Sequence, residues 1–273
     1  MFGLLAGLLL AGLPAEPRCP DPTRMVSVAA GPFVMGSDAA ERRFAYALSS
    51  PAVREAAWFE AELPRRRVSL RAACIDRFLV TQDEYAAFVR ATGHRAPGIT
   101  RDGYLRQGFL VHDYDREVTP YLWRGGKPPD RLGDHPVVLV SASDASAFCR
   151  WRHPDLRLPT EAEWEKAARG NRGSTFPWGD SWDPGRLNSA ASGINATTPV
   201  ARFSSGVSPY GLFDAVGNVF QWTSSELGDG RRVLKSCAWD DEPGLCRPAF
   251  RHGRPSESRH ILFGFRCAGP PKR

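Results

Sequence analysis

Six cysteines are the residues of this 273-residue chain with the widest range of possible chemistry. No two of them stand in a Cys-x-x-Cys spacing, which excludes zinc ribbons and thioredoxin-type redox motifs. Their even number leaves every thiol a possible partner. In an oxidising compartment such a set is typical of a disulfide framework.

The other residue types that carry chemistry do not form the common catalytic motifs. The six histidines never fall at the spacing of a zinc protease helix. The segment 112–115, His-Asp-Tyr-Asp, could ligate a metal but is more typical of a solvated loop. The segments 124–127 and 192–193 lack the flanking residues of a phosphate-binding loop and of a nucleophile elbow. These absences exclude most simple hydrolase and nucleotide-binding functions.

The net charge of +6 does not indicate a nucleic-acid partner, because the basic residues are almost all scattered arginines. One arginine-rich stretch, Arg247 to Arg259, suggests a basic groove that favours an acidic ligand. Gly 26 and Pro 23 exclude long helices, coiled coils and helical solenoids, and a mean hydropathy of −0.35 indicates a globular chain.

The amino terminus predicts export. Phe2 to Leu13 is almost entirely apolar, too short for a membrane span of about 20 residues and of the right length for a signal peptide. We expect cleavage near Ala15, with residues 1–18 as the leader and residues 19–273 as a single domain. The predicted localisation is periplasmic or secreted, without a membrane span, which permits disulfides.

Short, irregularly spaced elements must position these residues. The sequence predicts strands at Met25–Val28 and Phe33–Met35 around a turn at Gly31-Pro32, and a helix from Ser50 to about Leu63. A strand at Arg67–Ala72 and a helix at Thr81–Val89, opened by a capping box, follow.

The second half of the chain continues the same pattern. Residues 93–134 predict a long surface loop, Val137–Val140 a buried strand, and Asp144–Trp151 a helix. A second capping box at 160–163 opens a helix that ends at Gly170. Turns then run to a last strand at Phe263–Cys267, so the fold class is α+β, irregular and rich in loops.

Four segments resemble one known family. They are 31–37 (GPFVMGS), 157–170 (RLPTEAEWEKAARG), 210–222 (YGLFDAVGNVFQW) and 264–268 (GFRCA). In this order and spacing they are similar to the formylglycine-generating enzymes, the sulfatase-modifying factor family, from about Met25 to Ala268. The resemblance implies a compact, irregular α+β fold related to C-type lectins.

The resemblance also implies a chemistry, which this chain retains only in part. Catalysts of the family oxidise a sulfatase cysteine to formylglycine with O2 and a copper(I) ion held by a Cys-x4-Cys pair. An ungapped alignment from Arg232 puts Asp241 at the first copper position and Cys246 at the second. The family's preceding glycine pair is here Ser236-Cys237. One carboxylate and one thiolate make a poor copper(I) site, because copper(I) is soft and prefers two sulfurs.

Three interpretations of Cys237 and Cys246 stay open. They could close a short loop as a structural disulfide, which we favour in an exported chain, or form a displaced copper pair, or act as a redox-active disulfide. The catalytic candidates are therefore Cys246, Cys237 and Asp241.

The remaining cysteines follow from the resemblance. Cys149 and Cys267 match positions that exported members join, which leaves Cys19 with Cys74. The family's other structural disulfide would need cysteines at Ala168 and Arg251, and both are absent.

The resemblance further implies structural Ca²⁺, with copper disfavoured as a cofactor. Oxygen ligands suit this hard cation. The first site would use Asp214, Gly217, Val219 and Gln221, where the family usually has Glu at position 221. The second would use Asn188, Ser189, Ser192 and Ile194.

Three functions remain. The chain is an exported protein of binding or assembly that lacks copper oxidase activity, with an unknown protein or an acidic ligand as partner. Alternatively, it is a copper-dependent formylglycine-generating oxidase that uses Cys246 with Cys237. The third is a non-haem iron oxidative enzyme, whose iron would be bound by histidine and carboxylate side chains from one set of residues. That set is His252, His260, Asp240, Asp241 and Glu242.

Overall fold

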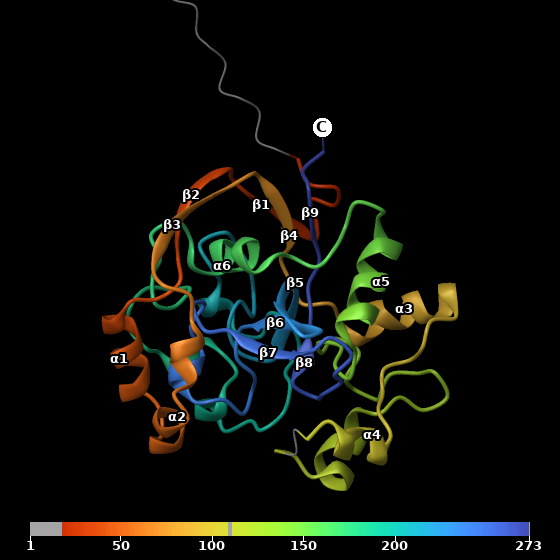
Figure 1. The fold of residues 1–273 in the computed structure, drawn as a ribbon. Helices are drawn as coiled ribbons and strands as arrows, with labels where there is room; N and C mark the ends of the chain where they lie inside the picture. The colour runs from red at the N-terminus through yellow and green to blue at the C-terminus, as the bar shows by residue number, and fades with distance from the viewer. Residues whose placement is uncertain (1–17, 109–110, 273) are drawn as a thin grey trace, which may run out of the picture.

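The computed structural model describes residues 18–108 and 111–272 (Figure 1). All but the last residue of the predicted leader, including the expected cleavage position, lies outside the described residues. The helices are α1 (Ala39–Ala47), α2 (Pro51–Glu55), α3 (Gln82–Thr92), α4 (Arg101–Arg106), α5 (Ala142–Arg152) and α6 (Glu161–Arg169). The strands are β1 (Met25–Val28), β2 (Gly31–Met35), β3 (Arg66–Leu70), β4 (Ala73–Asp76), β5 (Phe220–Gly228), β6 (Arg231–Lys235), β7 (His252–Pro255), β8 (Phe263–Gly264) and β9 (Ala268–Gly269).

The described strands form three small sheets that loops connect. Their orders are β1-β4-β9, β2-β3 and β7-β6-β5-β8. All pairs are antiparallel except β5 with β8. Figure 1 shows β1 to β4 at one end of the molecule, α3 and α5 on one flank, and α1 and α2 on the other. The predicted irregular α+β, loop-rich fold is confirmed.

Local side-chain signals determine where the helices begin. Thr81 accepts a hydrogen bond from the Glu84 N–H, and Glu84 accepts one from the Thr81 N–H, so the predicted capping box is present. Thr160 and Glu163 do the same at α6, which ends at Gly170 with a φ of 73°. These signals act within four residues, and for that reason the sequence alone could locate them.

Several predicted boundaries are wrong. Gly31 and Pro32 lie inside β2 rather than in a turn, and β1 and β2 pair with other strands. The helix expected from Ser50 to Leu63 stops at Glu55, because Ala57 adopts a left-handed conformation with a φ of 51°. A short 3₁₀ turn, η1 (Trp58–Ala61), follows it.

The segment 137–140 is buried as expected but is not a strand. Its backbone bonds irregularly, from the Val137 N–H to the Val80 carbonyl and from the Leu139 N–H to the His260 carbonyl. The last expected strand divides into β8 and β9. The hairpin of β5 and β6, with β7 beside it, was not predicted.

The segment 93–134 is more ordered than a surface loop. It contains α4 and a single π-turn, η2 (Tyr114–Val118), and the side chains of Tyr104 and Tyr121 are buried in the core. Because charged residues surround these two tyrosines in the sequence, the sequence alone did not indicate that they are buried.

Three disulfides join all six cysteines, in the pairs Cys19–Cys74, Cys149–Cys267 and Cys237–Cys246. The resemblance implied Cys149–Cys267, Cys19–Cys74 was predicted as the pair that remained, and Cys237–Cys246 is the interpretation that we favoured. In the part of the chain that the structure describes, no helix is both long and apolar enough to cross a membrane.

Candidate functional site

The loop between Cys237 and Cys246 is the centre of the candidate site, and we call residues 236–247 the disulfide loop. It leaves β6 at Ser236, whose φ of 77° is unusual for a residue with a side chain. Both cysteines are fully buried. A short 3₁₀ turn, η7 (Pro243–Leu245), returns the chain to Cys246.

The acidic side chains of this loop are held by its own backbone and by distant segments. Asp241 accepts a hydrogen bond of 2.6 Å from the Ala238 N–H. Burial, and the nearby carboxylates of Asp240 and Glu242, raise the pKa of Asp241 well above its usual range. Glu242 accepts a hydrogen bond from the Ser50 N–H. Asp241 and Glu242 offer oxygen atoms and no sulfur, so they cannot replace the two sulfur ligands that copper(I) prefers.

A buried network of ion pairs between α6 and the end of β6 holds the strand from which the disulfide loop begins. Three residues of α6, spaced four apart, lie on one helical face: Glu161, Glu165 and Arg169. Lys235, at the end of β6, donates to Glu165 at 3.1 Å and lies 3.4 Å from Glu161. The family-like segment 157–170 thus supplies the counter-charges for the strand that leads into the disulfide loop.

The segment from Asp38 to Glu62, which we call the arm, covers the loop from one side. It contains α1, α2 and η1. Arg247, the residue after Cys246, is fully buried between the carboxylates of Glu41 and Glu62 and lies over the Phe59 ring at 4.8 Å. Burial raises the pKa of Glu41 even though Arg247 is beside it.

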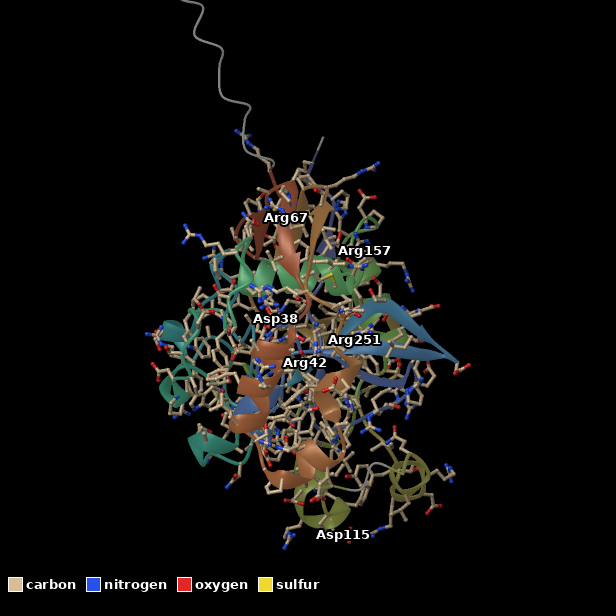
Figure 2. The ribbon with its side chains drawn as sticks, turned by 60° about the vertical axis from the view of Figure 1, so that its left-hand side comes forward. Asp38, Arg42, Arg67, Asp115, Arg157 and Arg251 are labelled. Carbon is tan, nitrogen blue, oxygen red and sulfur yellow. A yellow bond between two sulfur atoms is a disulfide. The ribbon has the colours of Figure 1, made fainter. Side chains whose placement is uncertain are left out.

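The arm packs so closely against the disulfide loop that position 244 has room only for a glycine. A Cβ atom on Gly244 would lie 2.3 Å from the Ala45 carbonyl oxygen. Figure 2 shows Asp38 and Arg42 on the arm.

His112 covers the loop from the other side. Its Nε2 lies 3.0 Å from Asp240 Oδ2, and its ring packs on Trp239 with 5.0 Å between centroids. His260 lies on the far side of His112 at 5.5 Å, and the Tyr104 hydroxyl donates to the His112 carbonyl. His112 is only 8% exposed, so the prediction of a solvated loop at 112–115 is wrong for this residue. No sequence signal linked it to Asp240, 128 residues later.

The histidines of the predicted iron site have different surroundings. His252 stacks against Trp58 and Phe220, and burial lowers its pKa to about 3. His260 contacts Tyr104 and His112 instead. Across residues 18–108 and 111–272, no group of three His, Cys, Asp or Glu side chains is arranged to hold a metal ion.

The residues of the first predicted calcium site are committed to internal hydrogen bonds. Gln221 Oε1 accepts from Trp164 at 2.6 Å and from Arg266 at 2.7 Å, while its amide nitrogen donates to the Asp214 carbonyl. The Asp214 carboxylate accepts from the Ala201 N–H. The Arg266 guanidinium, fully buried, also donates to the Asp214 carbonyl at 3.0 Å. The Arg266 guanidinium, itself a cation, therefore contacts Gln221 Oε1 and the Asp214 backbone carbonyl, and these two oxygens do not fit Ca²⁺ as well.

Gly217 and Val219 were expected to provide backbone carbonyls to the same site. The Gly217 carbonyl accepts from the Val219 N–H at 2.9 Å. Gly217 is also pressed against its neighbour, since a Cβ there would lie 2.7 Å from the Asn188 carbonyl oxygen.

The second predicted calcium segment keeps one unassigned oxygen. Ser192 donates to Asn188 Oδ1 at 2.9 Å, and the Ile194 N–H lies 3.3 Å from the Ser192 hydroxyl. The Ser189 hydroxyl is buried and has no hydrogen-bond partner among the described residues. One orphan hydroxyl without a carboxylate is a weak donor set for a dication.

Three of the arginines between Arg247 and Arg259 form ion pairs, and Arg254 lines a small cavity with His260 and Phe263. Arg247, Arg251 and Arg259 are paired with Glu62, Glu161 and Asp144. The positive charge that the sequence placed at a surface is largely used inside the molecule.

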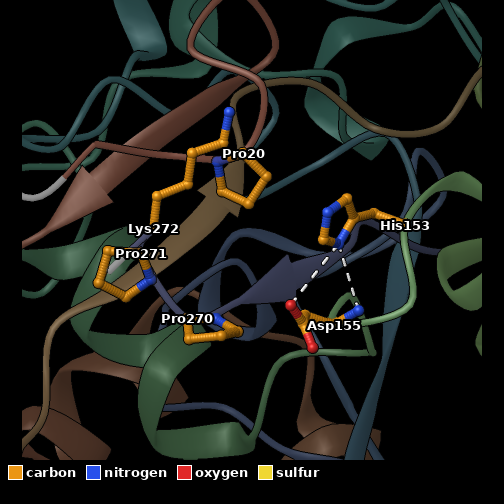
Figure 3. A pocket seen from close by; sticks show the side chains of 6 residues that line it. All are labelled: Pro20, His153, Asp155, Pro270, Pro271 and Lys272. Atoms are coloured by element: carbon orange, nitrogen blue, oxygen red, sulfur yellow. Dashed lines mark hydrogen bonds and ion pairs between the residues drawn. The ribbon is translucent and has the colours of Figure 1, made fainter.

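An open cavity of about 520 Å³ lies beside the arm, where Asp38, Glu41 and Phe44 contribute to its lining. Another, of about 530 Å³, is lined by Pro20, His153, Asp155 and the segment 270–272 (Figure 3). It lies where the two ends of the described chain meet, since the Lys272 N–H donates to the Arg18 carbonyl. It contains none of the predicted site residues.

Comparison with known proteins agrees with the resemblance. Residues 11–270 match the family described as sulfatase-modifying factor enzyme 1-like domain. The chain is 32% identical to the mouse inactive C-alpha-formylglycine-generating enzyme 2, over 100% of this chain and 96% of the relative. It is also 32% identical to the cattle formylglycine-generating enzyme, over 90% of this chain and 75% of the relative. Among solved structures, PvdO from Pseudomonas aeruginosa superposes with a TM-score of 0.67 at 23% identity, over 90% of this chain and 94% of that one. This last likeness supports the fold alone.

Proposed function

Because this chain belongs to the sulfatase-modifying factor enzyme 1-like family, we propose that it is an exported member that serves in binding or assembly and not in copper-dependent oxidation. Overall similarity does not decide between the two roles. Relatives named as an enzyme and as an inactive form are each 32% identical to it. The decision therefore rests on the residues of the disulfide loop.

The observation that carries the proposal is the bond between Cys237 and Cys246. A copper(I) site of the family's kind needs two thiolates at the metal. Here the cysteine aligned with the second copper position is bonded to Cys237, and a hard carboxylate, Asp241, stands at the first. All six cysteines are paired, so the resting protein offers no thiolate.

The covering of the loop supports the same conclusion. A reacting cysteine of a protein substrate would have to reach the sulfurs of Cys237 or Cys246, both fully buried. The arm lies over Arg247 on one side, and His112 lies over Asp240 on the other. Binding through exposed loops on this closed core does not require access to either sulfur.

Export is supported by the three disulfides, because such bonds persist in oxidising compartments and are rare in reducing ones. The iron alternative gains no support, since Asp240 is hydrogen-bonded to His112 and the described residues contain no group of three His, Cys, Asp or Glu side chains arranged for a metal.

The test is an oxidase assay on the purified full chain. We would supply Cu(I), O2 and a synthetic peptide carrying a sulfatase cysteine, with and without prior reduction, and measure aldehyde by mass spectrometry. We expect no aldehyde under either condition. Turnover that appears after reduction and vanishes in Cys246→Ser would overturn the proposal in favour of the displaced copper pair.

A matched variant gives the positive control. Cys237→Ser with Asp241→Cys re-creates the Cys-x4-Cys spacing in the same loop. We expect this variant to bind Cu(I) more tightly than the native chain in a competitive chelator titration, because it offers two free thiolates. Equal binding by the native chain would contradict the inference that its sulfurs are withheld.

A further inference from the structure

The strand β3 is an open edge in the described structure. It pairs with β2 and with no other described strand, and its residues are mostly exposed. Figure 1 shows β2 and β3 together at the outside of the molecule, away from the larger sheet of β5 to β8. An open strand edge presents unpaired backbone donors and acceptors to a partner.

The register identifies the backbone groups that face outward. Val34 of β2 stands opposite Arg67 of β3, and Pro32 stands opposite Ser69. The Val34 N–H donates to the Asn171 carbonyl, on the side of β2 away from β3. Val34 and Arg67 are therefore a pair without mutual hydrogen bonds, since these alternate with bonded pairs along an antiparallel ladder. The N–H and carbonyl groups of Arg67 and Ser69 consequently face the open edge.

The side chains beside these groups are basic. Successive strand residues alternate between faces, so Arg65, Arg67, Ser69 and Arg71 share one side of the strand and its continuation. All four are exposed. Arg65 is paired with Glu41 at 3.2 Å, whereas Arg67 and Arg71 make no ion pair with any described residue. Figure 2 shows Arg67 on the strand, away from the paired Arg251.

From this edge we propose that β3 binds an extended acidic peptide segment of a partner protein, which adds to the sheet as a strand beside Arg67 and Ser69. Backbone groups of the partner would bond to the outward groups of these two residues, and carboxylates at every second position would meet Arg67 and Arg71. Residues two apart in a strand are about 6.6 to 6.8 Å apart, which matches one face of an extended peptide.

Arginines on an edge strand can instead serve only to prevent unwanted pairing. The two roles differ in what they predict. An edge that only prevents pairing should bind no added strand, whatever the pattern of its side chains. A docking edge should bind a strand with acidic residues at alternate positions, and it needs its outward N–H groups. The proposal rests on the binding role of the chain, but its test measures no oxidation, so the two can fail separately.

The experiment uses the full chain and a fluorescent peptide of five Glu-Val repeats, with binding followed by fluorescence anisotropy. We expect Arg67→Glu with Arg71→Glu to weaken binding about tenfold or more, which corresponds to about 1.4 kcal/mol. The matched control is Arg90→Glu with Arg150→Glu, two exposed arginines on α3 and α5. This pair makes the same change in net charge and should alter binding less than about twofold, because long-range charge is screened.

Ser69→Pro tests the backbone component. Proline removes one outward N–H, and Ser69 stands opposite Pro32, so the β2–β3 pairing loses no hydrogen bond there. We expect a loss of binding of about fivefold with the arginines intact. Hydrogen exchange of the native chain gives a second measurement that needs no variant, since the Arg67 and Ser69 amides should be protected by the peptide.

Three results would overturn the proposal. The first is equal affinity for a block peptide of five Glu followed by five Val, which has the same composition without the alternation. The second is displacement by heparin in native protein and Ser69→Pro alike, which would indicate general anion binding. The third is the absence of any peptide-dependent protection at Arg67 and Ser69.

Discussion

Two groups of arginines have opposite roles in this protein. Arg247 is fully buried beside Cys246, held by Glu41 and Glu62 from the arm. Arg67 and Arg71, in the run of arginines at β3, are exposed and make no ion pair with a described residue. The same side chain secures the core at one place and faces solvent at the other. Fixed counter-charges nearby decide which role an arginine has.

This contrast corrects what the sequence alone suggests about the positive charge. The stretch from Arg247 to Arg259 suggested a basic groove, yet its members pair with Glu62, Glu161 and Asp144. Those carboxylates are 185, 90 and 115 residues away in the sequence, so a local count could not find them. The run at 65–71 alternates with Ser69 in the sequence, but only the pairing of β2 with β3 shows that it lies along an open edge.

The largest effect should come from removing a buried arginine. We expect Arg247→Met to lower the free energy of unfolding by about 3–5 kcal/mol, because Glu41 and Glu62 would stay buried with fewer counter-charges. Arg67→Met, the matched exposed change, should alter it by less than about 0.5 kcal/mol. Urea denaturation of both variants checks this. Equal effects would remove the distinction between the two groups of arginines.

The disulfide loop should show the next largest effect. Cys237→Ala with Cys246→Ala opens a loop of sequence separation 9, and loop entropy predicts a loss of about 2–3 kcal/mol. Because both sulfurs are buried, the native protein should also resist mild reductant until it unfolds. Mass spectrometry after thiol labelling measures this. Labelling of Cys237 and Cys246 in folded protein would show that the arm does not exclude reagents.

A pH titration tests the burial of His252, which belongs to the same C-terminal stretch. Burial, followed by the charge of Arg254, lowers the pKa of His252 to about 3 in the folded state. The unfolded chain takes up the proton near pH 6.5, so stability falls as pH decreases from 6.5 toward 3. Between pH 7 and pH 5 this histidine should account for a loss of about 2 kcal/mol.

His252→Phe keeps the aromatic stack and removes the titration. His135 and His260 also have lowered pKa values, so part of the pH dependence should persist in this variant. The comparison of variant with native chain at pH 7 and pH 5, by urea denaturation, isolates the share of His252. An unchanged pH dependence would mean that the imidazole is hydrated in solution.

How far the sequence could predict this structure depends on the range of each interaction. The capping boxes at Thr81 and Thr160 act within four residues and were found directly. The resemblance supplied the Cys149–Cys267 pair and the related fold, whereas the α+β, loop-rich class followed from the predicted elements themselves. The hairpin of β5 and β6 was missed, because Gln221 and Trp222 read as part of a loop when their partners on β6 are not considered.

The same limit applied to the candidate site. Cys237 and Cys246 are near in sequence, and their pairing was the favoured interpretation. His112 and the arm were not connected with this loop, since their contacts with Asp240, Glu242 and Arg247 span 128, 192 and 206 residues. Only the folded chain shows that two remote segments enclose the same loop.

The smallest effect that we expect concerns Ca²⁺, and it extends the comparison to a third arginine. Arg266 is fully buried like Arg247, and it donates to the Gln221 side chain and to the Asp214 backbone carbonyl, at two of the residues expected to hold the ion. Burial lowers the pKa of Arg266 to about 10, so it stays charged at neutral pH and opposes a dication beside it. A chelator should therefore lower the Tm by less than about 2 °C, the shift expected for a loss of about 0.5 kcal/mol. A larger decrease, reversed by added Ca²⁺, would mean that the ion is bound and that Gln221 and Asp214 give up their bonds to Arg266. Gln221→Glu, which restores the family's usual charge, should replace the hydrogen bond from Arg266 with an ion pair in the absence of calcium. Calorimetry with and without Ca²⁺ would separate these two uses of the new carboxylate.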